Sequence, residues 1–220
     1  APISPSDLAL LITFGGDLAN INISGSEENT VASMKVHPAM MKSMKSRLDQ
    51  AMPAGNEGAG IVVDAGSNVK HLTGKTVGLA GGAMYSQYIC VPAVNCLVMD
   101  DETTPAEAAS SFVNPMTALS FVETMKMENH SGIVNTAAAS NLGQMLVKIC
   151  NDDDIPLVNI VRTQEQVDLL KNIGAKYVCN TSEENFKETL VTALIETGAT
   201  LGFDATGGGN NGELPGQILA

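Results

Sequence analysis

One stretch of the chain decides the fold: Gly132-Ile133-Val134-Asn135-Thr136-Ala137-Ala138-Ala139-Ser140-Asn141-Leu142-Gly143-Gln144-Met145-Leu146. A short apolar run is followed by small residues and then by a pattern typical of an amphipathic helix. Where a strand enters a helix through a turn without bulky side chains, free backbone N–H groups meet the positive end of the helix dipole. Such a turn can bind the pyrophosphate of a dinucleotide.

The turn matches the dinucleotide-binding pattern GxGxxG only in part. It reads Ala138-x-Ser140-x-x-Gly143, so only the last glycine is present. Two interpretations stay open on these residues: a phosphate-binding turn, or an ordinary strand–helix connection. The Ser140 hydroxyl could bond a phosphate oxygen, or its Cβ could push the cofactor away.

Strand patterns and helix patterns alternate from Ser131 onward. The expected strands are 132–137, 157–161, 177–179 and 200–205, with helices expected at 141–150, 164–173 and 184–196. This alternation is typical of a parallel, doubly wound sheet, which is an α/β fold. A complete dinucleotide-binding domain of this kind has six strands. Four strands therefore favour a chain that is a fragment of a longer protein.

The first half of the chain has a different pattern. Short apolar runs with glycines between them occupy 60–66 and 76–83, and residues 85–91 alternate with Tyr85 on the apolar face. Closely spaced strands with glycine-rich turns predict a small, partly open β-barrel. We expect a β-rich domain over 1–104 and an α/β domain over 105–220.

A helix start is clearly marked at the beginning of the second domain. Thr104-Pro105-Ala106-Glu107 combines a threonine cap, a proline at the first helical position and the glutamate of a capping box. The helix is expected to stop before Asn114-Pro115, because the proline ring disfavours helical geometry in the residue before it. A second helix is expected over 117–126.

Composition excludes several classes of protein. Of the 220 residues, 44% are hydrophobic and 16% charged, which is typical of a globular chain. The formal net charge of −12 argues against nucleic acid or an anionic membrane as a partner. The four cysteines are far apart and form no CxxC pair, which favours reduced thiols in the cytoplasm over a zinc site or disulfides.

The residues that follow each expected strand are the candidate ligand-binding residues, because open parallel sheets bind ligands at the carboxyl ends of their strands. After the first strand these are Ala138, Ser140, Asn141, Leu142 and Gly143.

Arg162 follows the second expected strand, 19 positions beyond Gly143. NAD-binding folds often place an acid there for the ribose 2′-hydroxyl, whereas an arginine would pair with a 2′-phosphate, which favours NADPH. The other interpretation is a surface arginine near a helix start. After the fourth strand come Asp204, Thr206 and Gly207. Asp204 could bind ribose or substrate, or it could shape the turn.

Four segments, in order along almost the entire chain, carry a resemblance to a known family. They are Pro2-Ile3-Ser4-Pro5-Ser6-Asp7, Gly55-Asn56-Glu57-Gly58-Ala59-Gly60, Asn114-Pro115-Met116-Thr117-Ala118 and Asp204-Ala205-Thr206-Gly207-Gly208. Together they resemble the medium-chain dehydrogenase/reductase superfamily, on its zinc-independent quinone oxidoreductase and enoyl reductase side. The resemblance implies an N-terminal GroES-like β-barrel domain followed by a Rossmann NADP-binding domain, here truncated. It also implies a homodimer when the protein is complete.

The resemblance further implies roles for individual residues. The Asn-Pro-x-Thr-Ala segment of the family lies by the nicotinamide, so Asn114 and Thr117 are candidate cofactor contacts. Tyr85 is a candidate acid or pocket wall, and Asn56 a weaker pocket candidate. Glu57 resembles a position that is often structural. The zinc ligands of the family's alcohol dehydrogenases are missing from the opening and GHE-like motifs, so no zinc is expected.

Three functions remain open at this point. The first is a cytoplasmic, NADPH-dependent and zinc-free enzyme that delivers hydride to a quinone or another α,β-unsaturated carbonyl. The second is an enoyl-thioester reductase acting on an enoyl-CoA or enoyl-ACP. The third is a non-catalytic, crystallin-like protein that binds NADPH. In the first two, the partner is an electrophilic small molecule.

Overall fold

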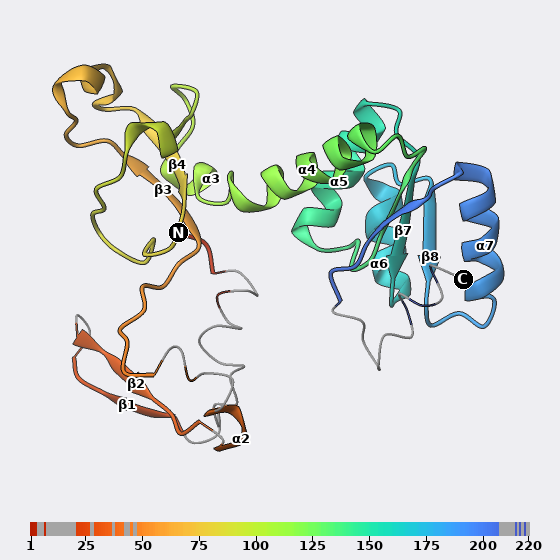
Figure 1. Ribbon diagram of the computed structural model, residues 1–220, viewed down its shortest axis with the longest axis horizontal. Coiled ribbons are helices and arrows are strands. Elements are labelled where there is room, and N and C mark those ends of the chain that lie inside the picture. Colours follow the sequence, from red (N-terminus) through yellow and green to blue (C-terminus); the bar gives the residue numbers. More distant parts are fainter. Residues whose placement is uncertain are drawn as a thin grey trace. The chain divides into compact units, whose positions relative to one another are not determined.

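The computed structural model describes residues 1–3, 7, 21–26, 29–36, 38–41, 45, 48–206, 214, 216 and 218. The chain divides into two compact units, Ala1–Val113 and Asn114–Ala220. Figure 1 shows the helices and strands of both units. No helix in the described part of the chain is long and apolar enough to cross a membrane.

The first unit contains small antiparallel sheets. Strands β1 (Asn22–Ser24) and β2 (Val31–Ser33) pair with each other, and the short helix α2 spans Pro38–Met41. A second sheet has the order β3 (Glu57–Ile61), β4 (Thr76–Ala80), β5 (Leu97–Val98). Its core is formed by Val77, Leu79 and Met84. The described residues show these two sheets, and the GroES-like barrel stays a prediction.

Short helices connect and follow the second of these sheets. The 3-10 helices η4 (Ser67–Leu72) and η5 (Ala93–Asn95) lie in its connections, and α3 spans Pro105–Ala108. The predicted capping box of α3 is confirmed. The Thr104 backbone N–H donates to Glu107 Oε2 at 2.9 Å, and the Glu107 N–H donates to Thr104 Oγ1 at 3.3 Å.

Two expectations about this region are wrong. Residues 85–91 form no strand. Residues 85–90 are all exposed, so the alternating pattern does not place one side of the segment against a hydrophobic core. Helix α4 spans Val113–Met127 and therefore begins before Asn114-Pro115 rather than after it. Pro115 is tolerated because it lies in the first turn, where backbone N–H groups have no partner within the helix.

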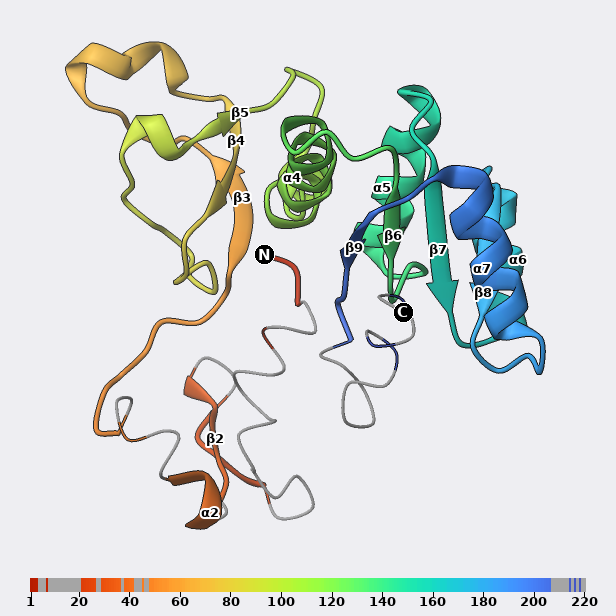
Figure 2. The same ribbon diagram turned by 45° about the vertical axis from the view of Figure 1, so that its right-hand side comes forward.

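The second unit is a doubly wound α/β structure. Its elements after α4 are β6 (Ile133–Asn135), α5 (Asn141–Asp152), β7 (Leu157–Val161), α6 (Gln164–Asn172), β8 (Tyr177–Asn180), α7 (Phe186–Thr197) and β9 (Leu201–Phe203). The four strands are all parallel in the order β8-β7-β6-β9. Strands β9, β6 and β7 can be seen side by side in Figure 2. The predicted parallel sheet is confirmed.

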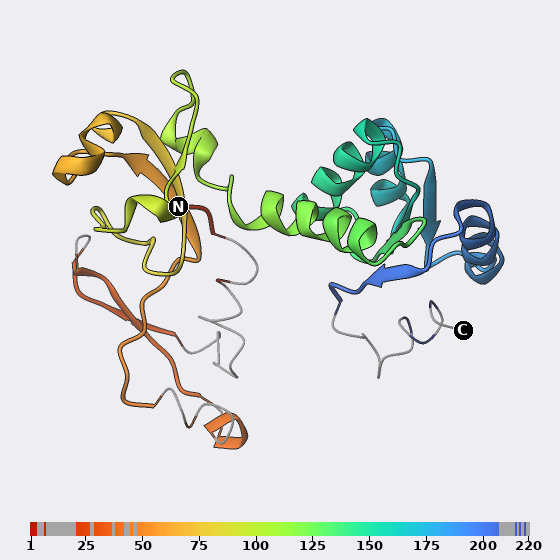
Figure 3. The ribbon, with the colours of Figure 1, turned by 45° about the horizontal axis from the view of Figure 1, so that its top comes forward.

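Two hydrophobic clusters cover the two faces of this sheet. On one face α4, α5 and α6 pack on Ile133, Leu157 and Val161. On the other face α7 packs on Val134, Val158 and Ile160. Figure 3 shows α4 and α5 on the side of the sheet away from α7. The residues of β6 and β7 are buried on both faces, which is why these two strands are mostly apolar in sequence.

Candidate functional site

The topology of the second unit places a switch point at β6. The chain proceeds from β6 to β7 and β8 on one side, and then returns to β9 on the other side of β6. In open parallel sheets the crevice that binds ligands lies at the carboxyl ends of the two strands where the order reverses. Those ends are occupied here by Thr136 after β6 and Asp204 after β9.

Hydrogen bonds join the two strand ends directly. The buried Thr136 Oγ1 donates to Asp204 Oδ1 at 2.7 Å and accepts the Ala205 N–H at 2.8 Å. The N–H and the hydroxyl of Thr206 also donate to Asp204 Oδ1, at 2.9 and 2.6 Å. Of the two interpretations of Asp204, these contacts favour the one in which it shapes the turn. Gly207 lies outside the described residues.

The turn between β6 and α5 is held by its own polar groups. Ala137 has a left-handed backbone with φ +49°, and its carbonyl accepts the Ser140 N–H at 2.9 Å. Ser140 caps α5, because its side chain accepts the Gly143 N–H at 3.2 Å. The Gln144 side chain donates to the Ala139 carbonyl at 2.9 Å.

Position 143 has no room for a side chain and requires glycine. A Cβ at this position would lie 2.1 Å from the Ala138 carbonyl oxygen and 2.5 Å from the Ala138 carbonyl carbon. Ala138 is itself fully buried, and its N–H donates to the Ile160 carbonyl of β7 at 3.2 Å. The first turn of α5 therefore packs directly against the backbone of the loop. This is the close helix–strand contact that the last glycine of the dinucleotide pattern allows.

The turn is suited to a phosphate group. Among the described residues, nothing accepts the backbone N–H groups of Asn141 and Leu142, the first two residues of α5. They lie at the positive end of a 12-residue helix, where an anion is stabilised. Ser140 has φ −66°, so a side chain there requires no strained backbone. Ser140 and Asn141 are exposed, which leaves the turn accessible to a ligand.

Arg162 lies one residue beyond β7, at the same edge of the sheet as this turn. Its side chain is exposed, and its backbone N–H donates to Gln166 Oε1 at 2.9 Å. No carboxylate in the described part of the chain forms an ion pair with it. The guanidinium is therefore available for a phosphate.

Asn114 and Thr117 both lie in the first two turns of α4 and are partly buried. The helix is fixed on the sheet by Ala118 and Val122, and Phe121 stacks on Phe203 with ring centroids 3.7 Å apart. Phe203 is the last residue of β9, so α4 packs next to the switch point.

The candidate residues of the first unit gather around Asp7, whose role the sequence did not reveal. Asp7 is buried, and its Oδ1 accepts the Asn56 N–H at 3.2 Å. Tyr85 Oη donates to the Pro2 carbonyl at 3.2 Å. Partial desolvation, together with the charge of Asp7 and a hydrogen bond to it, raises the pKa of Tyr85. Asp7 thus brings Tyr85 and Asn56 together.

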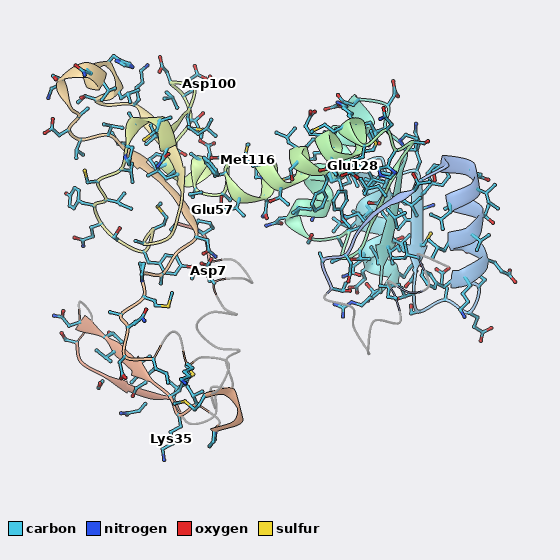
Figure 4. The ribbon with its side chains drawn as sticks, in the orientation of Figure 1. Asp7, Lys35, Glu57, Asp100, Met116 and Glu128 are labelled. Atoms are coloured by element: carbon cyan, nitrogen blue, oxygen red, sulfur yellow. The ribbon has the colours of Figure 1, made fainter. Side chains whose placement is uncertain are left out.

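Glu57 has a structural position, as its resemblance implied. It is 5% exposed, and its Oε2 accepts the N–H groups of Phe112 at 3.1 Å and Val113 at 2.8 Å. Figure 4 labels Glu57 and Asp7 in the first unit. The carboxylate satisfies backbone donors at the start of α4, which have no acceptor within the helix. No group of three or more potential metal ligands occurs in the described residues.

Known proteins to which the chain is similar are named as enoyl reductases or quinone reductases. No family model matches the chain. It is 29% identical over 199 residues to the mitochondrial enoyl-[acyl-carrier-protein] reductase of Xenopus tropicalis, covering 81% of this chain and 55% of the relative. A candidate NADPH:quinone reductase from Mesorhizobium loti matches with a TM-score of 0.66 and 30% identity, covering 77% of this chain and 50% of that one.

A further solved structure, a mycobacterial protein complexed with NADPH, has a TM-score of 0.56 and 21% identity, with 69% of this chain and 48% of that one covered. At that identity the likeness shows the fold alone. The chain spans about half the length of these relatives.

Proposed function

Because the chain is a member of the medium-chain dehydrogenase/reductase superfamily, we propose that it forms part of an NADPH-dependent, zinc-independent oxidoreductase. Its substrate would be a quinone or another α,β-unsaturated carbonyl, the hypothesis favoured by the Mesorhizobium loti structure. The observation that carries the proposal is the turn before α5, where two backbone N–H groups that have no acceptor among the described residues lie at a helix N-terminus beside the switch point.

Each part of the chain would have a defined task. The N–H groups of Asn141 and Leu142, with the Ser140 hydroxyl as a donor, would hold the pyrophosphate. Arg162 would pair with the 2′-phosphate through charge-assisted hydrogen bonds. Asn114 and Thr117 would contact the nicotinamide. Bound NADPH supplies a hydride to the electrophilic carbon of the acceptor.

A proton is also needed when an enone or enoyl group is reduced. Tyr85 is the proposed donor, with Asn56 beside it, because a tyrosine hydroxyl carries its proton at neutral pH and the buried Asp7 lies next to both residues. Asp7 would position both residues through the Asn56 backbone and its contact with the tyrosine.

The second candidate function is enoyl-thioester reduction. It is favoured by the relatives named as enoyl-[acyl-carrier-protein] reductases in Xenopus tropicalis, Mus musculus and Caenorhabditis elegans. The two functions differ in the acceptor and not in the cofactor site. Those relatives are named as mitochondrial, so a mitochondrial location is the alternative to the cytoplasm. A homodimer is proposed, and one solved relative is described as a heterodimer.

The cofactor assignment is tested by measuring NADPH and NADH affinity of the chain and of Arg162→Ala. A charge-assisted hydrogen bond contributes about 1.5–3 kcal/mol, so the variant should bind NADPH at least about tenfold more weakly and NADH almost unchanged. Lys171→Ala, an exposed cation in the last turn of α6, is the matched control and should behave as wild type. Equal affinities for the two cofactors in the wild type would refute the assignment.

The reaction is tested on the whole protein that contains this chain. NADPH oxidation is followed with a quinone, an enone and an enoyl-CoA, each compared with Tyr85→Phe. Turnover of the enoyl-CoA but not the quinone, with a rate that depends on Tyr85, selects the second function. Tight NADPH binding with background oxidation for every acceptor selects the non-catalytic protein.

A further inference from the structure

Two asparagines lie next to each other in the interior of the parallel sheet. Asn135 is the last residue of β6, and its registered neighbour on β7 is Asn159. Both residues are 1% exposed. Because successive residues of a strand alternate between the two faces of a sheet, both amides lie on the face of Ile133 and Leu157, which α4, α5 and α6 cover. They are a polar pair within an apolar layer.

The hydrogen bonding of these two amides is incomplete. Asn159 Nδ2 donates to the Tyr177 carbonyl of β8 at 3.1 Å. Among the described residues, the buried side-chain atoms without a partner are Asn159 Oδ1, Asn135 Nδ2 and Asn135 Oδ1. A buried polar atom without a partner is costly, and native structures contain few of them. The three atoms therefore require an explanation.

The registered neighbours of the pair favour one arrangement. Strands β8 and β6 lie on opposite sides of β7, so the amide of Asn159 that donates toward β8 has its oxygen left for a donor from β6. The neighbour of Asn135 on β9 is Phe203, and the neighbour of Asn159 on β8 is Val178. In this row each asparagine is thus the only polar neighbour of the other. Asn135 Nδ2 is a donor, and Asn159 Oδ1 is an acceptor.

We propose that Asn135 and Asn159 form a ladder of amides that positions the turn between β6 and α5. In this ladder Asn135 Nδ2 donates to Asn159 Oδ1, and Asn159 Nδ2 donates to the Tyr177 carbonyl, so that side chains join β6, β7 and β8. Neighbouring strands lie about 4.8 Å apart, and amides stacked at that spacing on in-register strands form such ladders.

The ladder acts at the end of β6 that carries the turn. Thr136 follows Asn135 directly, and residues 137–143 form the turn and the start of α5. Arg162 directly follows β7, the strand that contains Asn159. Because the ladder ties the end of β6 to β7, it fixes where the turn lies relative to Arg162. This step rests on the proposed function, in which the turn binds the pyrophosphate and Arg162 the 2′-phosphate.

A double-variant cycle tests the hydrogen bond between the amides. Asn135→Leu and Asn159→Leu each leave the other amide unpaired, so each should raise the unfolding equilibrium constant about tenfold or more. The double variant leaves neither amide, so its unfolding constant should be about tenfold smaller than the product of the single effects predicts. Urea unfolding of the four proteins measures these constants. Single effects that simply multiply would overturn the ladder.

A crystal structure of the wild type decides the same point if a single variant does not fold. It should place Asn135 Nδ2 within about 3.2 Å of Asn159 Oδ1. A water molecule between the two amides, or an Asn135 amide turned away from Asn159, would overturn the ladder.

Cofactor affinity separates a positioning role from a purely structural one. In the folded double variant the turn and Arg162 lose their fixed spacing, so NADPH should bind about threefold or more weakly. NADH has no 2′-phosphate for Arg162 and should be affected less. Asn135→Gln keeps an amide donor and should retain more of the NADPH affinity than Asn135→Leu. Thr197→Val removes a buried hydroxyl at the end of α7 and is the control, which should lose stability but bind both cofactors as wild type does.

Two results of the binding experiment have different meanings. Equal NADPH affinity in the double variant and the wild type would overturn the positioning role. Equal affinity of the wild type for NADPH and NADH would refute the proposed function and with it the positioning role, while the unfolding cycle would still decide whether the two amides bond to each other.

Discussion

Replacing Gly143 by alanine tests the geometry on which the cofactor site depends. The new Cβ would lie 2.1 Å from a backbone oxygen of Ala138, far inside any real contact, and neither backbone segment is free to rotate away. Overpacking of this kind costs about 1–3 kcal/mol, and a backbone neighbour argues for the upper end. The better helix propensity of alanine returns up to about 1 kcal/mol. The net loss should be about 2 kcal/mol.

This loss corresponds to a roughly 30-fold change in the unfolding equilibrium and to a fall of roughly 8 °C in melting temperature for a domain of this size. Urea unfolding followed by circular dichroism measures it. Gly202→Ala is the control from the same unit, because among the described residues its Cβ would meet only Ile218 Cγ2, at an ordinary 3.6 Å. A Gly143→Ala protein as stable as wild type would show that α5 does not pack on the loop as described.

Three further predictions concern buried polar groups. Thr136→Val should cost about 1–3 kcal/mol of unfolding free energy because it removes a donor to Asp204, while Thr136→Ser should retain most of the stability. Glu57→Ala should cost more than Glu57→Gln in urea unfolding, since the amide oxygen of glutamine can still accept the two N–H groups. Burial raises the pKa of Cys150 to about 12 and of Cys179 to about 11, from 9.0. Between pH 9 and each raised pKa, the thiol is protonated in the native state and largely deprotonated in the unfolded state. The free energy of unfolding should therefore fall as pH rises above about 9. It should fall less steeply when both thiols are replaced by alanine.

The parallel half of the fold could be predicted because its signals are local. Leu157–Val161 is an apolar run bounded by a proline before it and a capping threonine after it, and the structure has β7 over those same residues. Thr163 caps α6 by accepting the Gln166 N–H at 3.3 Å. Because strand and helix alternate with short connections, the parallel order follows with few alternatives.

The contacts that hold the site together could not be predicted, because the paired residues are distant in sequence. Thr136 and Asp204 are 68 positions apart, and Asp7 and Asn56 are 49 apart. Neither pair has a signal in its own neighbourhood. The error at residues 85–91 has the same origin, since alternation predicts a strand only where a partner strand and a core exist to receive it.

The structure bears on whether Ser140 binds a phosphate oxygen or pushes the cofactor away. Its oxygen accepts the Gly143 N–H, so one of the amides that a phosphate could use is already occupied. A hydroxyl can accept and donate at once, however, and its proton can still point to a phosphate oxygen. The backbone N–H groups of Asn141 and Leu142 have no acceptor among the described residues and can bind the phosphate. The backbone at Ser140 is unstrained. Ser140 therefore occupies the Gly143 N–H and offers a phosphate its own hydroxyl donor instead. Because the close packing of the turn depends on Gly143 and not on position 140, loss of the earlier glycines is compatible with a dinucleotide site.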